Sequence, residues 1–281
     1  MDSVNFLGVK FDDIEAQEVV GNLLKRRAEA RFAYIVTPNA DHLARLKRLP
    51  ELRKLYDSAW LRLLDSQFLR RAAGALGLYA PHVATGADVT ALLLTLLPPQ
   101  KITVIGLDEK YFSAVAARYP HLTFVHHLPP AHLLYDHQAI AQARDFAVRE
   151  AAAFTLIALG SPIQEMLAYA IWLQPGSTGC GLCIGAALEF LSGAKRRAPV
   201  WMQRAGMEWI FRLAQDPRRL ARRYLLDDPP VLWDLVRARF RKTARLSRPG
   251  QPLPVVPGAS VANDPYPPRP SARLHEIQDA G

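Results

Sequence analysis

The sequence has little of what membrane-spanning or disulfide-stabilised proteins need. It contains only two cysteines among 281 residues, which excludes a framework of several disulfides. Half of the residues are hydrophobic, yet no uninterrupted apolar run approaches the roughly 18 to 20 residues that cross a bilayer. The first residues also lack the basic region and apolar stretch of a secretory signal peptide. These absences argue against an integral membrane or secreted protein and predict a protein of the reducing cytoplasm.

Several common motifs are absent as well. Neither a G-x-S-x-G elbow nor a G-x-x-x-x-G-K-[ST] loop occurs, which excludes the common hydrolase and P-loop classes. The two cysteines, Cys180 and Cys183, form one C-x-x-C pair without nearby histidines, so packed core thiols are favoured over a zinc site. The eight histidines are scattered, with no carboxylate pattern typical of metal ligands. We therefore expect no metal and no other cofactor.

Positive charge is concentrated in one segment. Residues 195–245 carry 14 Lys or Arg and 5 Asp or Glu, whereas the other 230 residues carry 21 of each sign. The whole net charge of +9 thus lies within this basic segment. Such a segment needs an acidic partner, which can be nucleic acid, an anionic membrane surface or a pyrophosphate ligand.

Short apolar runs alternate with amphipathic stretches over residues 33–191, which predicts an α/β fold with a buried parallel sheet. The expected strands are residues 32–36, 60–64, 101–106, 122–126, 154–159 and 180–185. Helices are expected between them, for example at residues 88–97, 110–119 and 139–152. The length suffices for one large domain or two small ones with a sizeable core.

Polar clusters follow three of the apolar runs. In open α/β sheets ligands bind beyond the carboxyl ends of the strands, so we expect the three clusters to face one cleft. In the first cluster, Thr37 and Asn39 suit hydrogen bonding to a sugar or phosphate, although a helix cap is favoured by the spacing alone. In the second, Asp65 suits a general base, because partial burial raises a carboxyl pKa, and it equally suits a helix cap.

The third cluster, at residues 159–165, contains a glycine turn between a strand and a helix. Backbone N–H groups near Gly160 could receive a diphosphate there, although one glycine turn is a weak signal. The glycines of residues 179–185 lack the G-x-G-x-x-G spacing of a dinucleotide loop, so this segment is interpreted as a buried strand.

The character of the chain changes after Pro199. Residues 200–246 are rich in Trp and Arg and predict a helical appendage after the α/β core of residues 1–199. Residues 247–281 hold 8 of the 22 prolines and few large apolar groups, so we expect this tail to be disordered.

The motifs together resemble the WecG/TagA/CpsF family, glycosyltransferase family 26, over about residues 5 to 240. The matching pieces, in chain order, are TPNADH (37–42), Asp65, TGADV (85–89), VIGL (104–107), LGSPIQE (159–165), IGAALEFLSG (184–193), RAP (197–199), and GMEWIFRL with DPRRLARRYL (206–226). Their order and spacing make the resemblance specific.

The resemblance implies a Rossmann-like core of the type called GT-E with a C-terminal appendage that closes over the site. It implies metal-independent, inverting transfer of a hexose-type sugar from a UDP-sugar to a polyprenyl-pyrophosphate-linked sugar. This reaction would serve bacterial surface polysaccharide or exopolysaccharide synthesis, with the enzyme peripheral on the inner face of the cell membrane. The protein could form homo-oligomers, and no nucleic-acid partner is expected.

Carried over by position, the resemblance makes Asp65 the candidate base. The substrate-binding residues that it implies are Thr37, Asn39, Thr85, Gly86, Gly106, Gly160, Gln164, Glu189, Arg212, Arg219 and Arg222. Three positions depart from the family pattern. Ser66 replaces a glycine after the base, while Val83 and Ile163 replace an arginine and a lysine. The donor sugar and the acceptor lipid are therefore not determined by the sequence.

The basic segment suits two functions. In the first, residues 200–245 form a mobile, membrane-seeking lid whose aromatics suit an anionic interface. Spacings of seven and three place Arg212, Arg219 and Arg222 on one face of a continuous helix, with Pro217 as a potential kink. The alternative is a non-catalytic protein that binds nucleic acid or a membrane surface, disfavoured because no nucleic-acid module accompanies the charge. Each arginine could also belong to a solvated helix face.

Overall fold

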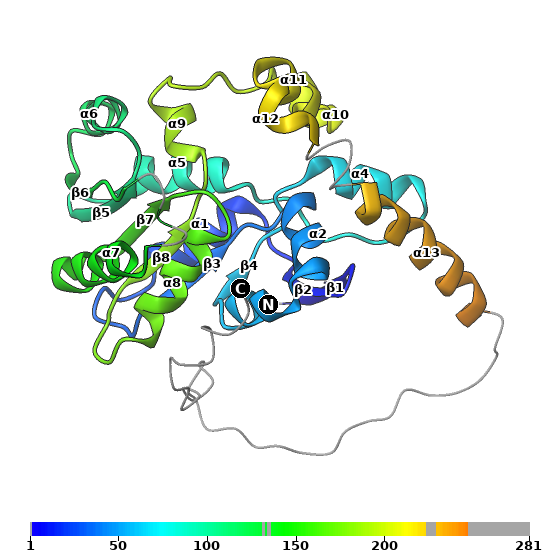
Figure 1. Cartoon of the computed structure of the whole chain (residues 1–281), viewed down its shortest axis with the longest axis horizontal. Helices are drawn as coiled ribbons and strands as arrows, with labels where there is room; N and C mark the ends of the chain where they lie inside the picture. Colours follow the sequence, from blue (N-terminus) through cyan, green and yellow to red (C-terminus); the bar gives the residue numbers. More distant parts are fainter. Residues whose placement is uncertain (1, 131–132, 134–135, 223–228, 247–281) are drawn as a thin grey trace.

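In the described part of the chain, six short strands form one sheet whose neighbours are all parallel, in the order β4-β3-β8-β7-β5-β6. The computed structural model describes residues 2–130, 133, 136–222 and 229–246 (Figure 1). The strands are β3 (Ala33–Val36), β4 (Leu61–Arg62), β5 (Lys101–Gly106), β6 (Thr123–His127), β7 (Phe154–Ala158) and β8 (Cys180–Cys183). The predicted α/β class and parallel sheet are confirmed.

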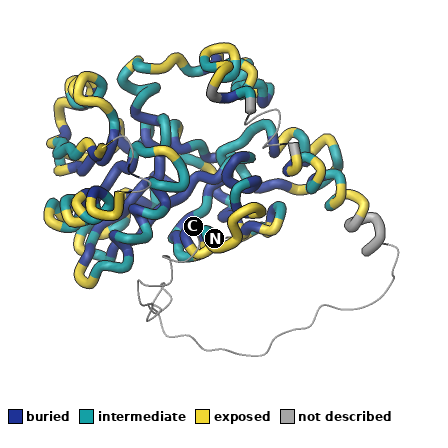
Figure 2. Tube along the Cα trace, viewed as in Figure 1, coloured by how far each residue is buried: buried dark blue, intermediate teal, exposed yellow. Residues whose placement is uncertain are grey.

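Helices cover both faces of this sheet, because neighbouring side chains of each strand point to opposite sides. Ile35 packs with one hydrophobic cluster, whereas Tyr34 and Val36 pack with the other. The first cluster includes residues of α1 (Ala16–Leu24), α5 (Gly86–Leu96), α6 (Glu109–Arg118) and α9 (Ala187–Leu191). The second includes residues of α2 (Ala40–Arg48), α3 (Arg53–Asp57), α7 (His137–Glu150) and α8 (Ile163–Leu173). Figure 2 shows the strands as the buried centre of the protein.

An antiparallel hairpin precedes the sheet and was not expected from the sequence. Its strands are β1 (Ser3–Phe6) and β2 (Val9–Asp12). Asp12 accepts a hydrogen bond of 2.8 Å from the backbone N–H of Arg62 and forms an ion pair with the Arg62 guanidinium. The hairpin is thereby attached to the edge strand β4.

Among the residues described after the core there are four helices: α10 (Val200–Ala205), α11 (Glu208–Gln215), α12 (Pro217–Arg222) and α13 (Pro229–Leu246). The predicted continuous helix through Arg212 and Arg222 is wrong, because α11 ends at Gln215 and α12 begins at Pro217. Proline has no N–H and disfavours a helical conformation in the residue before it. Asp216 accordingly lies outside the α-helical region, at φ −140° and ψ 68°.

Helix α13 lies against α2 and α4 (Gln67–Ala75). Its Val231 and Leu235 are buried in the same hydrophobic cluster as α2 and α8, and Lys47 of α2 forms an ion pair with Asp234. Cys180 and Cys183 are free thiols and fully buried, as predicted for core residues. The predicted tail, residues 247–281, lies outside the described residues.

Candidate active site

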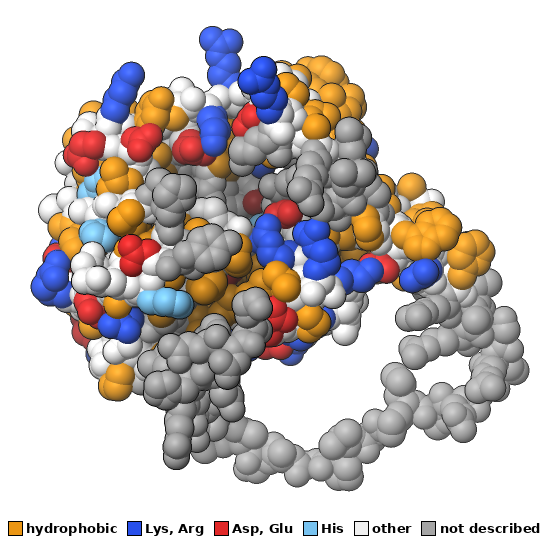
Figure 3. Space-filling view, viewed as in Figure 1, with side chains coloured by type: hydrophobic (Ala, Val, Ile, Leu, Met, Phe, Trp, Pro, Cys, Tyr) orange, Lys and Arg blue, Asp and Glu red, His pale blue; other side chains and the backbone are white. Residues whose placement is uncertain are grey.

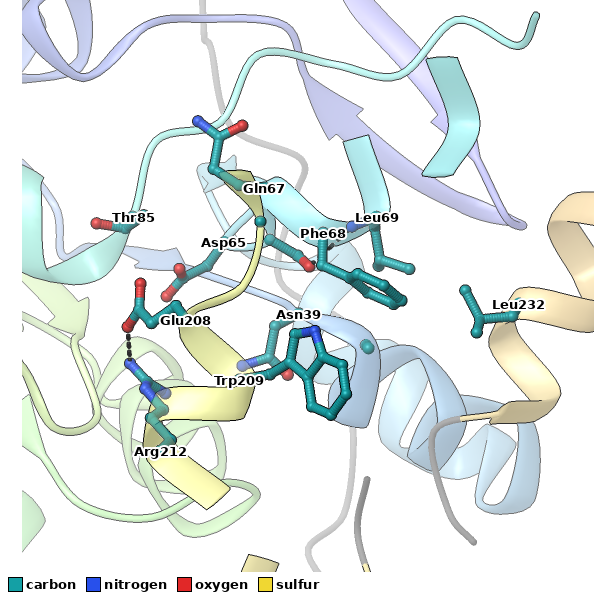
Figure 4. A pocket seen from close by; sticks show the side chains of 13 residues that line it. Asn39, Asp65, Gln67, Phe68, Leu69, Thr85, Glu208, Trp209, Arg212 and Leu232 are labelled. Atoms are coloured by element: carbon teal, nitrogen blue, oxygen red, sulfur yellow. Dashed lines mark hydrogen bonds and ion pairs between the residues drawn. The ribbon is translucent and has the colours of Figure 1, made fainter. Parts of the chain in front are cut away.

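Two cavities meet at the carboxyl edge of the sheet. The larger, of about 500 Å³, is lined by residues that follow β3, β4, β7 and β8, and so contains members of all three polar clusters. The smaller, of about 210 Å³, lies between the start of α4, the start of α11 and Leu232 of α13 (Figure 4). Some residues line both cavities: Asn39, Asp65, Thr85, Glu208 and Arg212. These residues mark the place where the cavities adjoin.

The junction of β3 and α2 supplies Thr37 and Asn39. The Thr37 hydroxyl donates a hydrogen bond of 3.1 Å to the carbonyl of Cys183, which ties the end of β3 to the end of β8. Asn39 caps α2, because its side chain accepts a hydrogen bond from the N–H of Asp41 and contacts His42 at 2.8 Å. The cap expected from the spacing is therefore present, and the same side chain also lines both cavities.

Asp65 lies in the short connection between β4 and α4. Its N–H donates a hydrogen bond of 3.0 Å to the carbonyl of Pro38, which places the residue beside the first cluster. The N-cap of α4 is Ser66, whose hydroxyl accepts from the N–H of Leu69 at 3.2 Å. Asp65 therefore does not cap this helix, and its carboxyl group lines the cavities instead.

The pKa of Asp65 is raised to about 6. Burial is the largest cause, because a partly desolvated carboxyl group disfavours its charged form. The charge of Arg212 lowers this pKa, the charge of Glu208 raises it, and the Gly86 N–H and His42 lower it further. A carboxylate with a pKa near 6 is ionised at neutral pH and is a stronger base than an ordinary aspartate.

The N-terminus of α5 forms the wall next to Asp65. Thr85 caps this helix by accepting a hydrogen bond of 3.0 Å from the N–H of Asp88. Gly86 is buried, and a Cβ atom there would lie 3.3 Å from the Thr37 hydroxyl oxygen. Arg197 joins this wall through a 2.5 Å ion pair with Asp88. Burial alone would raise the pKa of Asp88, but the hydrogen bond and charge of Arg197, with a Thr85 hydrogen bond, lower it.

The third cluster follows β7. Gly160 lines the larger cavity, and a Cβ atom there would meet nothing within 4 Å. The Gln164 side chain accepts from the N–H of Gly185 at 2.9 Å and donates to the Glu165 carboxylate at 2.7 Å. Burial would raise the pKa of Glu165, but the hydrogen bond and charge of His42 lower it. This buried network connects the loops after β3, β7 and β8.

Three basic side chains of the larger cavity were not identified from the sequence. Arg45 donates to the Ser161 hydroxyl at 2.7 Å, Lys195 pairs with Glu189 at 2.6 Å, and Arg197 reaches the α5 terminus. They add to Arg212, which pairs with Glu208 at 2.8 Å. Because Arg45 lies on α2 rather than in a phosphate-loop motif, no local pattern marks it. Val83 and Ile163 stand where the family pattern has an arginine and a lysine. The cavity nevertheless contains cations, because these four basic side chains line it.

One predicted residue lies outside this arrangement, and two others lie where the structure does not describe the side chains. Gly106 lines neither cavity, and its φ of +90° and a Cβ position 2.5 Å from the Ala158 carbonyl oxygen explain the glycine by packing. Arg219 and Arg222 belong to α12, but their side chains lie outside the described part of the protein. Their contact with a pyrophosphate stays a prediction.

Within the described residues, no group of three or more His, Cys, Asp or Glu side chains could hold a metal ion. Metal-independent activity also stays a prediction. None of the described helices is long and apolar enough to cross a membrane.

The sequence profile of the glycosyl transferase WecG/TagA/CpsF family matches residues 4–245. The chain belongs to this family. The glycosyltransferase is also similar to proteins named N-acetylglucosaminyldiphosphoundecaprenol N-acetyl-beta-D-mannosaminyltransferase. The protein of Staphylococcus aureus strain MW2 is 25% identical over 244 residues, covering 84% of this chain and 93% of the relative. The protein of strain MRSA252 is 24% identical over 248 residues, with the same coverage.

Family membership decides between the two functions that the sequence left open. This glycosyltransferase is an enzyme, and the non-catalytic alternative for the basic segment is no longer needed. The names of the relatives describe transfer to a sugar carried on a lipid diphosphate.

Proposed function

We propose that this glycosyltransferase moves a hexose-type sugar from a UDP-sugar to a polyprenyl-diphosphate-linked sugar, with inversion at the anomeric carbon. The product would serve bacterial surface polysaccharide or exopolysaccharide synthesis. One observation carries the proposal: a polar cavity with several cations and a smaller, more apolar cavity adjoin at the Asp65 carboxyl group. A transferase for two such different substrates needs two compartments that meet at one base.

The larger cavity suits the donor. Its cations and the backbone N–H groups beyond β7 are the groups that stabilise a diphosphate. Glu189 lies near Lys195 at the end that follows β8 and suits the hydroxyl groups of a ribose or the uracil ring. Thr37 and Asn39 would lie beside the transferred sugar.

The smaller cavity suits the acceptor. Phe68 and Trp209 meet edge to face there, with ring centroids 6.0 Å apart, and Leu232 completes an apolar wall. Aromatic faces and aliphatic side chains suit both a sugar ring and the first units of an isoprenoid chain. Arg212 borders both cavities and can bind a phosphate group of either substrate.

The proposed chemistry is one displacement. The acceptor hydroxyl oxygen forms a bond to the anomeric carbon of the donor while the bond from that carbon to the UDP oxygen breaks. Asp65 takes the hydroxyl proton, and UDP leaves with the electron pair of the broken bond. Cations and N–H groups stabilise the charge on the leaving group, so this scheme needs no divalent metal.

We also propose a role for each segment of the chain. Residues 1–199 form the catalytic core and residues 200–246 form an appendage on the membrane surface, with 247–281 as a tail. Val200, Trp201, Trp233 and Phe240 are each at least 60% exposed. Figure 3 shows apolar side chains over α10–α13 near Lys and Arg, a combination that suits an anionic interface. The enzyme would thus lie on the inner face of the cell membrane without crossing it.

The test is a transfer assay with a panel of UDP-sugars and a short-chain lipid-diphosphate-sugar acceptor. One donor is expected to give UDP and a lipid-linked disaccharide in equal amounts, with inverted anomeric configuration by NMR. Co-sedimentation with anionic liposomes, compared with binding to nucleic acid across a salt series, checks the membrane surface. Retention of configuration, or no transfer from any donor in the panel, would contradict the proposed reaction.

A further inference from the structure

A second carboxylate lies at the junction of the two cavities. Glu208 is the first residue of α11 and lines both cavities, as Asp65 does. Figure 4 shows the two carboxylates directed into the same space, with Arg212 bonded to Glu208 from one turn further along α11. A glutamate in the first turn of a helix and paired at i,i+4 is common on protein surfaces. Its place beside Asp65 is not explained by that local role.

The fold holds Glu208 close to Asp65 by docking α10 and the start of α11 on α4. Gly206 precedes α11 with φ +73°, and a Cβ atom there would lie 3.1 Å from the Cα of Phe68. Arg71 of α4 donates a hydrogen bond of 2.5 Å to the carbonyl of Arg204, and Trp209 contacts the Phe68 ring. Because Asp65 lies directly before α4, these contacts link the positions of the two carboxylates.

We propose that Glu208 is a positioning residue of the transfer reaction: it holds Arg212 at the rim of both cavities and faces Asp65 with a second negative charge. This inference rests on the proposed function, in which Asp65 is the base and Arg212 binds phosphate. Two effects follow from the geometry. One concerns the basicity of Asp65, and the other concerns the orientation of Arg212.

The first effect is electrostatic. Groups from every neighbouring element act on Asp65: Glu208 and Arg212 from α11, the Gly86 N–H from α5, His42 from α2 and Arg197 from the segment before α10. Only Glu208 among them makes the carboxylate a stronger base. Coulomb's law gives the general scale of such an effect: a like charge at the outer end of the range of about 4 to 6 Å shifts a pKa by about 0.5 unit in water and about 2 units at an effective dielectric constant of about 20.

The second effect is steric and directional. The 2.8 Å ion pair holds one N–H edge of the Arg212 guanidinium, and the central carbon of the group lies over the Phe190 ring, 5.3 Å from the ring centroid. A guanidinium held in this way keeps its remaining donors available for phosphate oxygens without losing further side-chain freedom. Glutamine at position 208 keeps an oxygen that can accept from Arg212, whereas alanine removes both the charge and the acceptor.

The experiment measures the Asp65 pKa directly in the full chain. Carbon-13 NMR of labelled aspartate carboxyl groups is followed from pH 4 to 8 in the wild type and in Glu208→Gln, with Asp65 assigned by its absence in Asp65→Asn. The matched control is Glu109→Gln, because Glu109 is also the first residue of a helix and pairs with His126 at 3.0 Å, yet lines neither cavity. Two kinetic quantities, the pH profile of kcat/KM and the KM for the acceptor, are measured on the same variants and on Glu208→Ala.

We expect Glu208→Gln to lower the Asp65 pKa by at least about 0.5 unit and to move the acid limb of kcat/KM by the same amount. Glu208→Ala should add a rise in acceptor KM of about tenfold, and Glu109→Gln should change neither quantity. An unchanged Asp65 pKa in a folded Glu208→Gln protein, or equal acceptor KM in the Gln and Ala variants, would overturn the inference. The NMR titration needs no turnover, so a wild-type enzyme that transfers no sugar contradicts the proposed reaction and not the pairing of the carboxylates.

Discussion

Replacing Asp65 by asparagine should make the protein more stable above pH 6 while removing most of its activity. Asparagine has nearly the shape of a protonated aspartate but carries no charge. In the folded protein the Asp65 pKa lies at about 6, against an ordinary value of 3.8, and burial is the main cause. Ionisation of Asp65 therefore costs free energy in the folded state that the unfolded chain does not require.

The sign and the pH range follow from this raised pKa. Below about pH 4 aspartate is protonated in both states, so wild type and Asp65→Asn should be equally stable. Between about pH 4 and 6 the unfolded wild type binds fewer protons than the folded wild type, so the free energy of unfolding of the wild type falls as the pH rises. Above about pH 6 this contribution is constant. A shift of about 2 units corresponds to about 3 kcal/mol, and solvent in the open cavities reduces this to about 1 to 2 kcal/mol.

The assay is urea unfolding of both proteins at pH 4, 6 and 8, with thermal melting beside it. The expected gain in the Asp65→Asn protein at pH 8 equals a rise in Tm of about 3 to 6 °C for a chain of this size. Transfer should fall by about 10² to 10⁴, as is typical when a general base is lost. The matched control is Asp88→Asn, because the pKa of Asp88 is lowered by Arg197 and its replacement should destabilise the protein above about pH 4.

A result in which Asp65→Asn is no more stable than wild type at pH 8 would refute the account of a costly buried charge. A variant with near-normal kcat would refute the role of Asp65 as base. The two readouts are independent, because stability reports the environment of the carboxyl group and kcat reports its use.

Three further predictions concern other parts of the protein. Transfer should persist after dialysis against EDTA, because the proposed leaving-group stabilisation uses cationic side chains and N–H groups; loss of turnover that Mg²⁺ or Mn²⁺ restores would contradict it. Gly106→Ala should lower the free energy of unfolding, measured in urea, by about 2 to 4 kcal/mol, because the added Cβ atom would lie 2.5 Å from the Ala158 carbonyl oxygen. The control is Gly21→Ala on α1, where the added Cβ atom would meet nothing within 4 Å, so this change should be neutral or stabilising. Truncation after Val200 should abolish both liposome binding and transfer. Thermal unfolding should show some loss of stability, because Val231 and Leu235 would no longer cover the core. A truncated chain that still binds liposomes and turns over normally would show that the basic segment is only a solvated surface.

The sequence by itself determined the α/β class and much of the site. Buried parallel strands need apolar residues on both faces, so most strands of the sheet are short apolar runs that can be recognised without their neighbours. The edge strand β6 is less apolar, because none of its residues is fully buried. The polar clusters at Thr37, Asp65 and Gly160 could be located because they follow such runs directly. Chain order and spacing of the motifs were enough to predict the family.

Only the tertiary structure decided how residues from distant segments meet. Hydrophobic periodicity says which face of a helix is buried but not which helix it contacts, so the docking of α10 on α4 and of α13 on α2 could not be predicted. That docking brings Glu208 and Arg212 to Asp65. The capping of α4 by Ser66 and the packing of Gly106 against Ala158 were likewise set by exact backbone positions. A general base can thus be located from one strand end, whereas the charges that set its pKa come from contacts that form only when the whole chain is folded.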